Sequence, residues 1–320
     1  MDRGPVHPGR MMRRVALSWL ALLLGLAPSA AAAQPAQDGD MIVVEGQRLT
    51  REQLRAKAND FVRKLGVVQG DRSVARWVDG LCPKVMGLSP DHARIVTDRL
   101  RATIKAIGAP LGKADCDTNF LVAFVSDGKD MAAIINDKRP SRMAQVEGPE
   151  RRTLLESDAA IRWWYTIRIG SGDGAMTSTT PSPVTGGNSE SGSSMLPDGV
   201  PMGGSFASSL IRTQAVRILS AATVIIDVNR AEGVSLNAAA DYAAFVGLAE
   251  VRGKTAPAVP SVLNLFAPQD RASALTDWDR RFLVELYDLP LNRFGRSQRG
   301  HLVKALVDED GAASGGDPAD

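Results

Sequence analysis

The first half of the chain opens with apolar positions at helical spacing. Thr50 and Gln53 form a capping box ahead of one such stretch, and Gly66 follows its end. Ser89 and Pro90 open a second stretch, in which apolar residues again recur at helical intervals. These patterns predict amphipathic helices, each with one face in a hydrophobic core.

Segments rich in apolar residues predict strands around these helices. The segments are residues 74–86, 119–125 and 161–169 in the first half and 223–228 in the second. The first two, with a helix between them, are typical of parallel strands joined by a right-handed crossover. Asp127 is suited to cap a further helix after the second strand.

Helical patterns dominate the second half. Ser235 is suited to cap an alanine-rich helix that runs to Val251. After a loop with the sequence PSVLN, Thr276 caps a helix within the stretch LTDWDRRFLVELYDL, with Asp279 at its third position. With a last helix at 297–307, these patterns predict an α+β fold, in which a strand–helix–strand N-terminal half is followed by a helix-rich C-terminal half.

The order of elements in this second half resembles the C-terminal part of zincin-type metallopeptidases. The resemblance lies in the buried helix, the PSVLN loop and the helix that opens with LTDWD. In that family the first helix carries H-E-x-x-H, which supplies zinc ligands and a general base. Here Asp241, Tyr242 and Phe245 occupy that region of the helix. The resemblance therefore implies a zincin-like framework without its metal site. The whole chain is also similar to uncharacterised exported bacterial proteins.

Residues 1–33 predict a signal peptide that is cleaved after Ala33. Arg10, Arg13 and Arg14 precede an apolar core that is too short for a membrane span. Loss of this leader changes the net charge from +2 to −1, because it discards four arginines and one aspartate. No basic stripe and no membrane-spanning run remain, so we expect a periplasmic or secreted protein with no nucleic-acid partner.

Composition also divides the mature chain. Residues 170–205 are mostly Gly, Ser, Thr and Pro, and such a stretch buries too little apolar surface to fold. We therefore expect an N-terminal α/β half at 34–169, a disordered linker at 170–206, a mostly helical half at 207–307 and a disordered tail at 308–320.

The stretch DMIVVEGQR, at residues 40–48, carries the short apolar run Met41–Val44. An extended apolar segment near a chain terminus can add to the sheet edge of a partner. The stretch is similar to the short box by which outer-membrane receptors engage the energy-transducing protein TonB. The alternative is an ordinary strand or an unstructured tail.

Cys82 and Cys116 are the only cysteines. In an exported protein two cysteines most simply pair, so we predict a disulfide between them. It closes a loop that contributes about 3–4 kcal/mol in the chain-entropy model.

The motifs of several common enzymatic chemistries are missing. The histidines are His7, His92 and His301, and none belongs to an H-x-x-x-H motif. There is no G-x-S-x-G for a serine nucleophile and no C-x-x-C. We therefore expect no catalytic residue, no metal and no cofactor to be identifiable from motifs.

Polar residues of the second half form the candidate site. Asp227 and Asn229 end a predicted strand, Asp241 and Tyr242 lie on the alanine-rich helix, and Asp279 lies on the next one. If these elements pack together, paired carboxylates can perform acid–base chemistry or bind a cation. The alternative is a structural role for each carboxylate, such as a helix cap.

An aromatic run offers a second candidate surface. If residues 161–169 form a strand, Trp164 faces away from Trp163 and Tyr165. An exposed tryptophan there indicates a ligand or partner surface, whereas buried ones indicate core packing.

These patterns favour an exported, non-catalytic binding or scaffold protein, whose partner is a protein or a small molecule. The alternatives are a carboxylate- or metal-dependent hydrolase and a partner of a TonB-type outer-membrane transport system.

Overall fold

The computed structural model describes residues 49–171, 212–213, 215–253, 255–267 and 271–313. The predicted signal peptide, the Met41–Val44 segment and most of the predicted linker lie outside the described residues.

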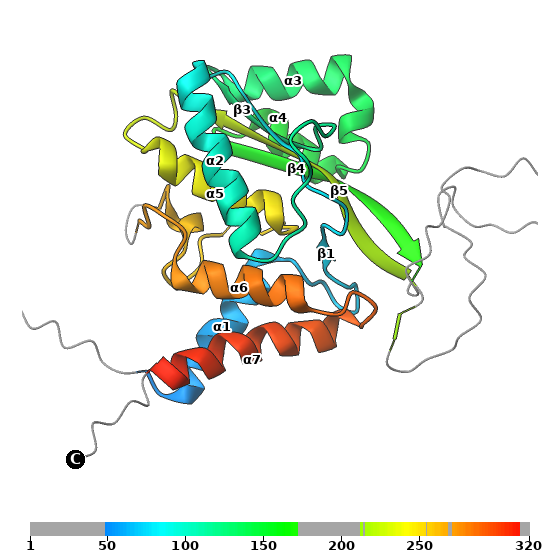
Figure 1. Ribbon diagram of the computed structural model, residues 1–320, viewed down its shortest axis with the longest axis vertical. Coiled ribbons are helices and arrows are strands. Elements are labelled where there is room, and N and C mark those ends of the chain that lie inside the picture. The colour runs from blue at the N-terminus through cyan, green and yellow to red at the C-terminus, as the bar shows by residue number, and fades with distance from the viewer. Residues whose placement is uncertain (1–48, 172–211, 214, 254, 268–270, 314–320) are drawn as a thin grey trace, which may run out of the picture. The chain divides into compact units, whose positions relative to one another are not determined.

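One mixed sheet organises the described chain (Figure 1). Strands β2, β3 and β5 are parallel neighbours in that order, and β1 pairs in parallel with the start of β5. Strand β4 runs antiparallel along the other side of β5. The bounds are β1 Ala75–Arg76, β2 Pro83–Met86, β3 Phe120–Val125, β4 Ile161–Ser171 and β5 Ala215–Asp227. Within the described residues, β2 and β4 are thus edge strands, and the two-residue β1 also has a single neighbour, β5.

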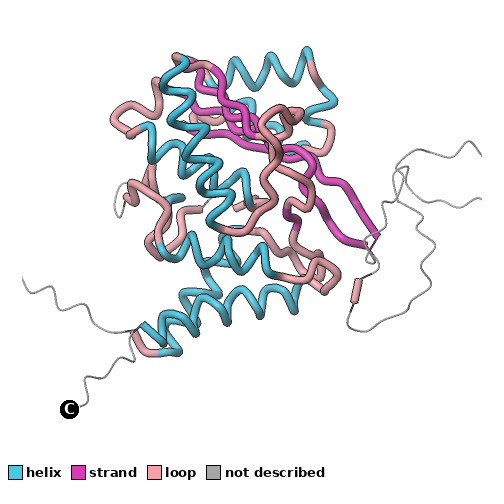
Figure 2. Tube along the Cα trace, in the orientation of Figure 1, coloured by secondary structure: helices cyan, strands magenta, loops and turns pink. Residues whose placement is uncertain are grey.

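Helices cover both faces of this sheet, as expected for an α+β protein. Helices α2 and α5 pack on one face, and α3 and α4 pack on the other (Figure 1). Helices α1, α6 and α7 pack against one another beside α5. The bounds are α1 Arg51–Leu65, α2 Pro90–Ala106, α3 Gly128–Lys138, α4 Gly148–Glu156, α5 Leu236–Leu248, α6 Asp277–Asp288 and α7 Gly295–Ala313, with 3-10 turns η1 Pro140–Met143 and η2 Val262–Asn264. Figure 2 shows the loops that join these elements.

Local signals at the helix ends are confirmed. The predicted caps Thr50, Ser89, Asp127, Ser235 and Thr276 each accept a hydrogen bond from a backbone amide of the helix that follows. These caps work through near neighbours in sequence, and a sequence pattern therefore identifies them well.

Helix α5 is buried on all sides, because Ala238–Leu248 are all buried. Its small residues permit close approach to the sheet. A Cβ added to Gly247 would lie 2.1 Å from Cζ of Phe120 on β3. The helix ends at Leu248, before the predicted end at Val251, because the Tyr165 hydroxyl lies within hydrogen-bond distance of the backbone where α5 ends.

Other boundaries also differ from the sequence predictions. The single strand expected at 74–86 is two short strands, because β1 pairs with β5 whereas β2 pairs with β3. Strand β5 begins at Ala215, well before residue 223, since β4 pairs along its whole length. Helix α7 continues to Ala313, into the segment expected to be a disordered tail.

Strands from both expected halves share the one sheet, since β5 lies between β3 and β4. The parallel pairing of β2 with β3 around α2 is confirmed. The disulfide between Cys82 and Cys116 is confirmed as well.

In the part of the chain that the structure describes, no helix is both long and apolar enough to cross a membrane.

Candidate functional site

Two of the predicted polar residues lie where β5 ends. Asp227 is buried and accepts hydrogen bonds from the backbone amides of Gly128, at 2.9 Å, and Arg230, at 3.1 Å. The exposed Asn229 donates to the carbonyl of Ser126. Both side chains therefore tie the end of β5 to the start of α3.

Asp241, on α5, forms a bidentate ion pair with Arg99 of α2, at 2.5 and 2.7 Å. The same carboxylate accepts from the backbone amide of Leu275 at 2.9 Å. Hydrogen bonding to this carboxylate raises the pKa of Arg99. The buried carboxylate thus joins α5 to α2 and to the segment before α6.

Asp279, at the start of α6, is fully buried. It accepts from the Ser261 hydroxyl at 2.6 Å and from the amides of Val262 and Thr276 at 2.7 and 2.9 Å. Burial raises the pKa of Asp279, and these hydrogen bonds oppose the rise. Its role is that of a cap that also holds the loop before η2.

The candidate carboxylates therefore do not share one site. Asp241 and Asp279 meet adjacent amides at Leu275 and Thr276, whereas Asp227 binds a different segment. Each of these carboxylates accepts hydrogen bonds from other residues of the chain. Among the described residues, no group of three or more His, Cys, Asp or Glu side chains is placed to hold a metal ion.

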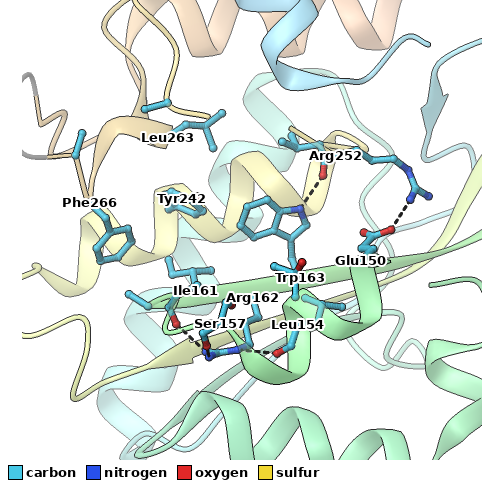
Figure 3. Close-up of a pocket in the computed structure, with 16 residues that line it drawn as sticks. Glu150, Leu154, Ser157, Ile161, Arg162, Trp163, Tyr242, Arg252, Leu263 and Phe266 are labelled. Carbon is cyan, nitrogen blue, oxygen red and sulfur yellow. Dashed lines mark hydrogen bonds and ion pairs between the residues drawn. The ribbon is translucent and has the colours of Figure 1, made fainter. Parts of the chain in front are cut away.

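Tyr242 differs from the other candidates, because it lines a pocket of about 430 Å³. We call this the β4 pocket. Its walls come from four segments, shown in Figure 3: α4 with Leu154, β4 with Ile161 and Trp163, α5 with Tyr242, and the loop after α5 with Leu263 and Phe266.

Aromatic rings form one wall of the β4 pocket. The Tyr242 ring contacts Trp163 and Phe266 edge-to-face, with ring centroids 5.9 and 5.8 Å apart. The indole nitrogen of Trp163 donates to the carbonyl of Val251 at 2.8 Å, which fixes the ring (Figure 3). These contacts position the aromatic wall.

The charged groups around the β4 pocket have partners within the chain. Arg252, from the loop after α5, binds Glu150 of α4 at 2.9 Å (Figure 3). Arg162 is buried, and its guanidinium donates to the carbonyls of Leu154, Ser157 and Ala159. A cation at the C-terminal end of α4 also suits the helix dipole. The lining therefore favours an uncharged, largely apolar ligand.

The aromatic wall of the β4 pocket carries one polar group of interest, the Tyr242 hydroxyl. Within the described part of the chain it has no hydrogen-bond partner, although the residue is only 7% exposed. Burial raises the pKa of Tyr242, so the hydroxyl stays protonated at neutral pH and can both donate and accept. It is a free polar contact at the edge of an apolar pocket.

Sequence reasoning identified part of this site. The predicted alternation is confirmed, since Trp164 packs against α3 and α4 while Trp163 and Tyr165 face α5. Only Trp163 is partly exposed, and it lines the pocket. Leu154 and Phe266 were missed, because nothing in their local sequence shows that distant segments meet there.

No protein-family model, curated protein or solved structure matches this chain.

Proposed function

We propose that this chain is an exported, non-catalytic binding protein that takes a small apolar or aromatic ligand into the β4 pocket. The unpartnered Tyr242 hydroxyl in an otherwise apolar wall carries the proposal. Ligand pockets commonly combine apolar walls with a few polar groups, and volumes of roughly 300–1,000 Å³ are typical.

The framework proposed for the C-terminal half is zincin-like. It is supported by the order α5, the η2 turn and α6, in which Asp241 and Asp279 serve packing and capping. Export to the periplasm is supported by the leader-like sequence of residues 1–33 and by the disulfide, which suits an oxidising compartment.

Titration with N-phenyl-1-naphthylamine tests the proposal, since this uncharged aromatic amine gains fluorescence in apolar surroundings. We expect saturable binding to the mature protein. Ala256→Trp places a large ring at the exposed rim of the pocket and is expected to abolish the signal. Ala258→Trp is the matched control, because Ala258 is exposed in the same loop but does not line the pocket. Equal binding by both variants would refute the proposal.

Two alternatives remain as hypotheses with their own tests. A carboxylate- or metal-dependent hydrolase around Asp227 and Asp241 is tested by metal analysis of the purified mature protein, in which stoichiometric zinc or manganese would favour it.

A TonB-type partnership depends on Met41–Val44, which lies outside the described residues. It is tested by pull-down with and without residues 34–48.

A further inference from the structure

The floor of the β4 pocket is one edge of the sheet. Five consecutive residues, Ala159 to Trp163, line the pocket; the last three belong to β4 and the first two lead into it. Strand β4 pairs with β5 alone within the described sheet. The pocket therefore runs along the start of β4.

The pairing register shows which backbone groups of β4 face the pocket. The amide of Asp227 donates to the carbonyl of Ala160, so the pair of these residues is hydrogen-bonded. In an antiparallel ladder such pairs alternate, and Arg162 and Trp164 therefore also bond to β5. The amides and carbonyls of Ile161 and Trp163 point away from β5.

The same edge already binds an amide elsewhere along the strand. The side-chain amide of Gln145 accepts from the backbone N–H of Ile167 at 2.7 Å and donates to its carbonyl at 2.9 Å. This primary amide makes the two hydrogen bonds that a peptide unit of a neighbouring strand would make. No such side chain bonds to the backbone of Ile161 or Trp163 among the described residues.

We propose that the ligand of the β4 pocket is an extended, uncharged polypeptide segment that adds to the edge of β4. Its backbone pairs with Ile161 and Trp163, and one aromatic or large aliphatic side chain inserts against Tyr242 and Phe266. Strand addition gives affinity through the backbone and specificity through the side-chain pocket. This inference rests on the proposed function, because it names the ligand class of the same site.

The paired charges at the rim support an uncharged segment. Glu150 and Arg252 form an ion pair at one side of the pocket, and Arg252 also binds Glu250, so a charged ligand group would have to break an ion pair or remain unpaired there. The Tyr242 hydroxyl is left to bind one polar group of the segment.

The test uses the peptide acetyl-Thr-Val-Phe-Val-Thr-amide and calorimetric titration of the mature protein. Two analogues carry N-methyl groups, one on both valines and the other on the phenylalanine, because these amides lie on opposite edges of an extended chain. A paired segment uses one edge, so one analogue is expected to lose at least about tenfold in affinity while the other stays within about threefold of the parent. Equal affinities of all three peptides, or equal losses in both analogues, would overturn the proposal.

Amide hydrogen exchange gives a second readout on the same complex. The amides of Ile161 and Trp163 are expected to gain protection when the peptide binds, while those of Arg162 and Trp164 are protected with and without it. Peptide binding without protection at Ile161 and Trp163 contradicts strand addition. If N-phenyl-1-naphthylamine binds and the peptide does not, the proposed binding of a small apolar ligand is supported and the peptide inference fails. If neither binds, the proposed function fails as well.

Discussion

The edge strands β2 and β4 are built in opposite ways. Strand β2 has four residues, starts at Pro83, and follows a cysteine that is covalently tied to Cys116. The side chain of Asn119 accepts from the amide of Cys82 and donates to the carbonyl of Gly80, so the approach to β2 is fixed as well. Strand β4 has eleven residues and carries no cysteine.

This difference between β2 and β4 indicates where backbone groups of the sheet can form hydrogen bonds with another strand. Unpaired strand edges invite association, and proteins commonly shorten, cover or interrupt them. Edge β2 is short, whereas β4 is covered by the Gln145 amide at Ile167. Beside the pocket, at Ile161 and Trp163, no described residue pairs with the outer side of β4. We therefore assign stability to one edge and binding to the other.

The largest effect is expected when the disulfide beside β2 is removed. Replacing Cys82 and Cys116 together by serine should lower the free energy of unfolding by about 3–4 kcal/mol, since the unfolded chain regains the freedom of the closed loop. Urea unfolding of the variant and the oxidised parent measures it. Affinity for N-phenyl-1-naphthylamine should be unchanged below the transition. A parallel loss of affinity would show that the two edges are coupled.

Tyr165 ties β4 to the end of α5, so Tyr165→Phe should cost about 1–3 kcal/mol by leaving the Val246 carbonyl without its hydroxyl donor. The amide of Val251 loses one of its two acceptors but keeps its hydrogen bond to the carbonyl of Ala249. Chemical denaturation of the variant and the parent measures the loss, and an unchanged free energy of unfolding would contradict this account of where α5 ends.

Gln145→Ala should lower stability by about 0.5–1.5 kcal/mol, because it removes both hydrogen bonds to Ile167 at an exposed position. The Ile167 amide should also exchange faster with solvent. Gln145→Glu keeps the acceptor but loses the donor and should lie between the parent and Gln145→Ala. An unchanged exchange rate in Gln145→Ala would mean that another group covers this edge.

The smallest effect is expected at the pocket wall. Tyr242→Phe should change the free energy of unfolding by no more than about 0.5 kcal/mol, since the hydroxyl has no partner within the described residues. Affinity for the probe peptide should fall. A stability loss as large as that of Tyr165→Phe would show that the hydroxyl is bonded in the free protein and would remove the main support for the pocket.

Sequence reasoning succeeded where the physics is local. Caps such as Thr50 and Thr276 act within one turn of their helix, and the apolar run at 119–125 matches β3. The disulfide was predicted from the presence of two cysteines and from the expectation of export. None of these needed knowledge of distant contacts.

The features that sequence reasoning missed depend on contacts between residues far apart in the sequence. Asp241 looked like a possible catalytic residue because its partner, Arg99, lies 142 positions away in sequence. Strand 74–86 was predicted as one element because its hydrophobicity does not reveal that its two ends pair with different strands. The pocket joins α4, β4 and the loop after α5, and no local pattern encodes that meeting.

The pairing of Ser171 with Ala215, at the joined ends of β4 and β5, has a practical consequence. The chain leaves and re-enters the sheet at neighbouring positions, so the sheet itself does not depend on how many residues connect them. Doubling the length of such a connection costs only about 0.6 kcal/mol in closure entropy. This junction is therefore the place to graft a reporter domain, or to substitute a two-residue hairpin turn, while the β4 pocket keeps its shape.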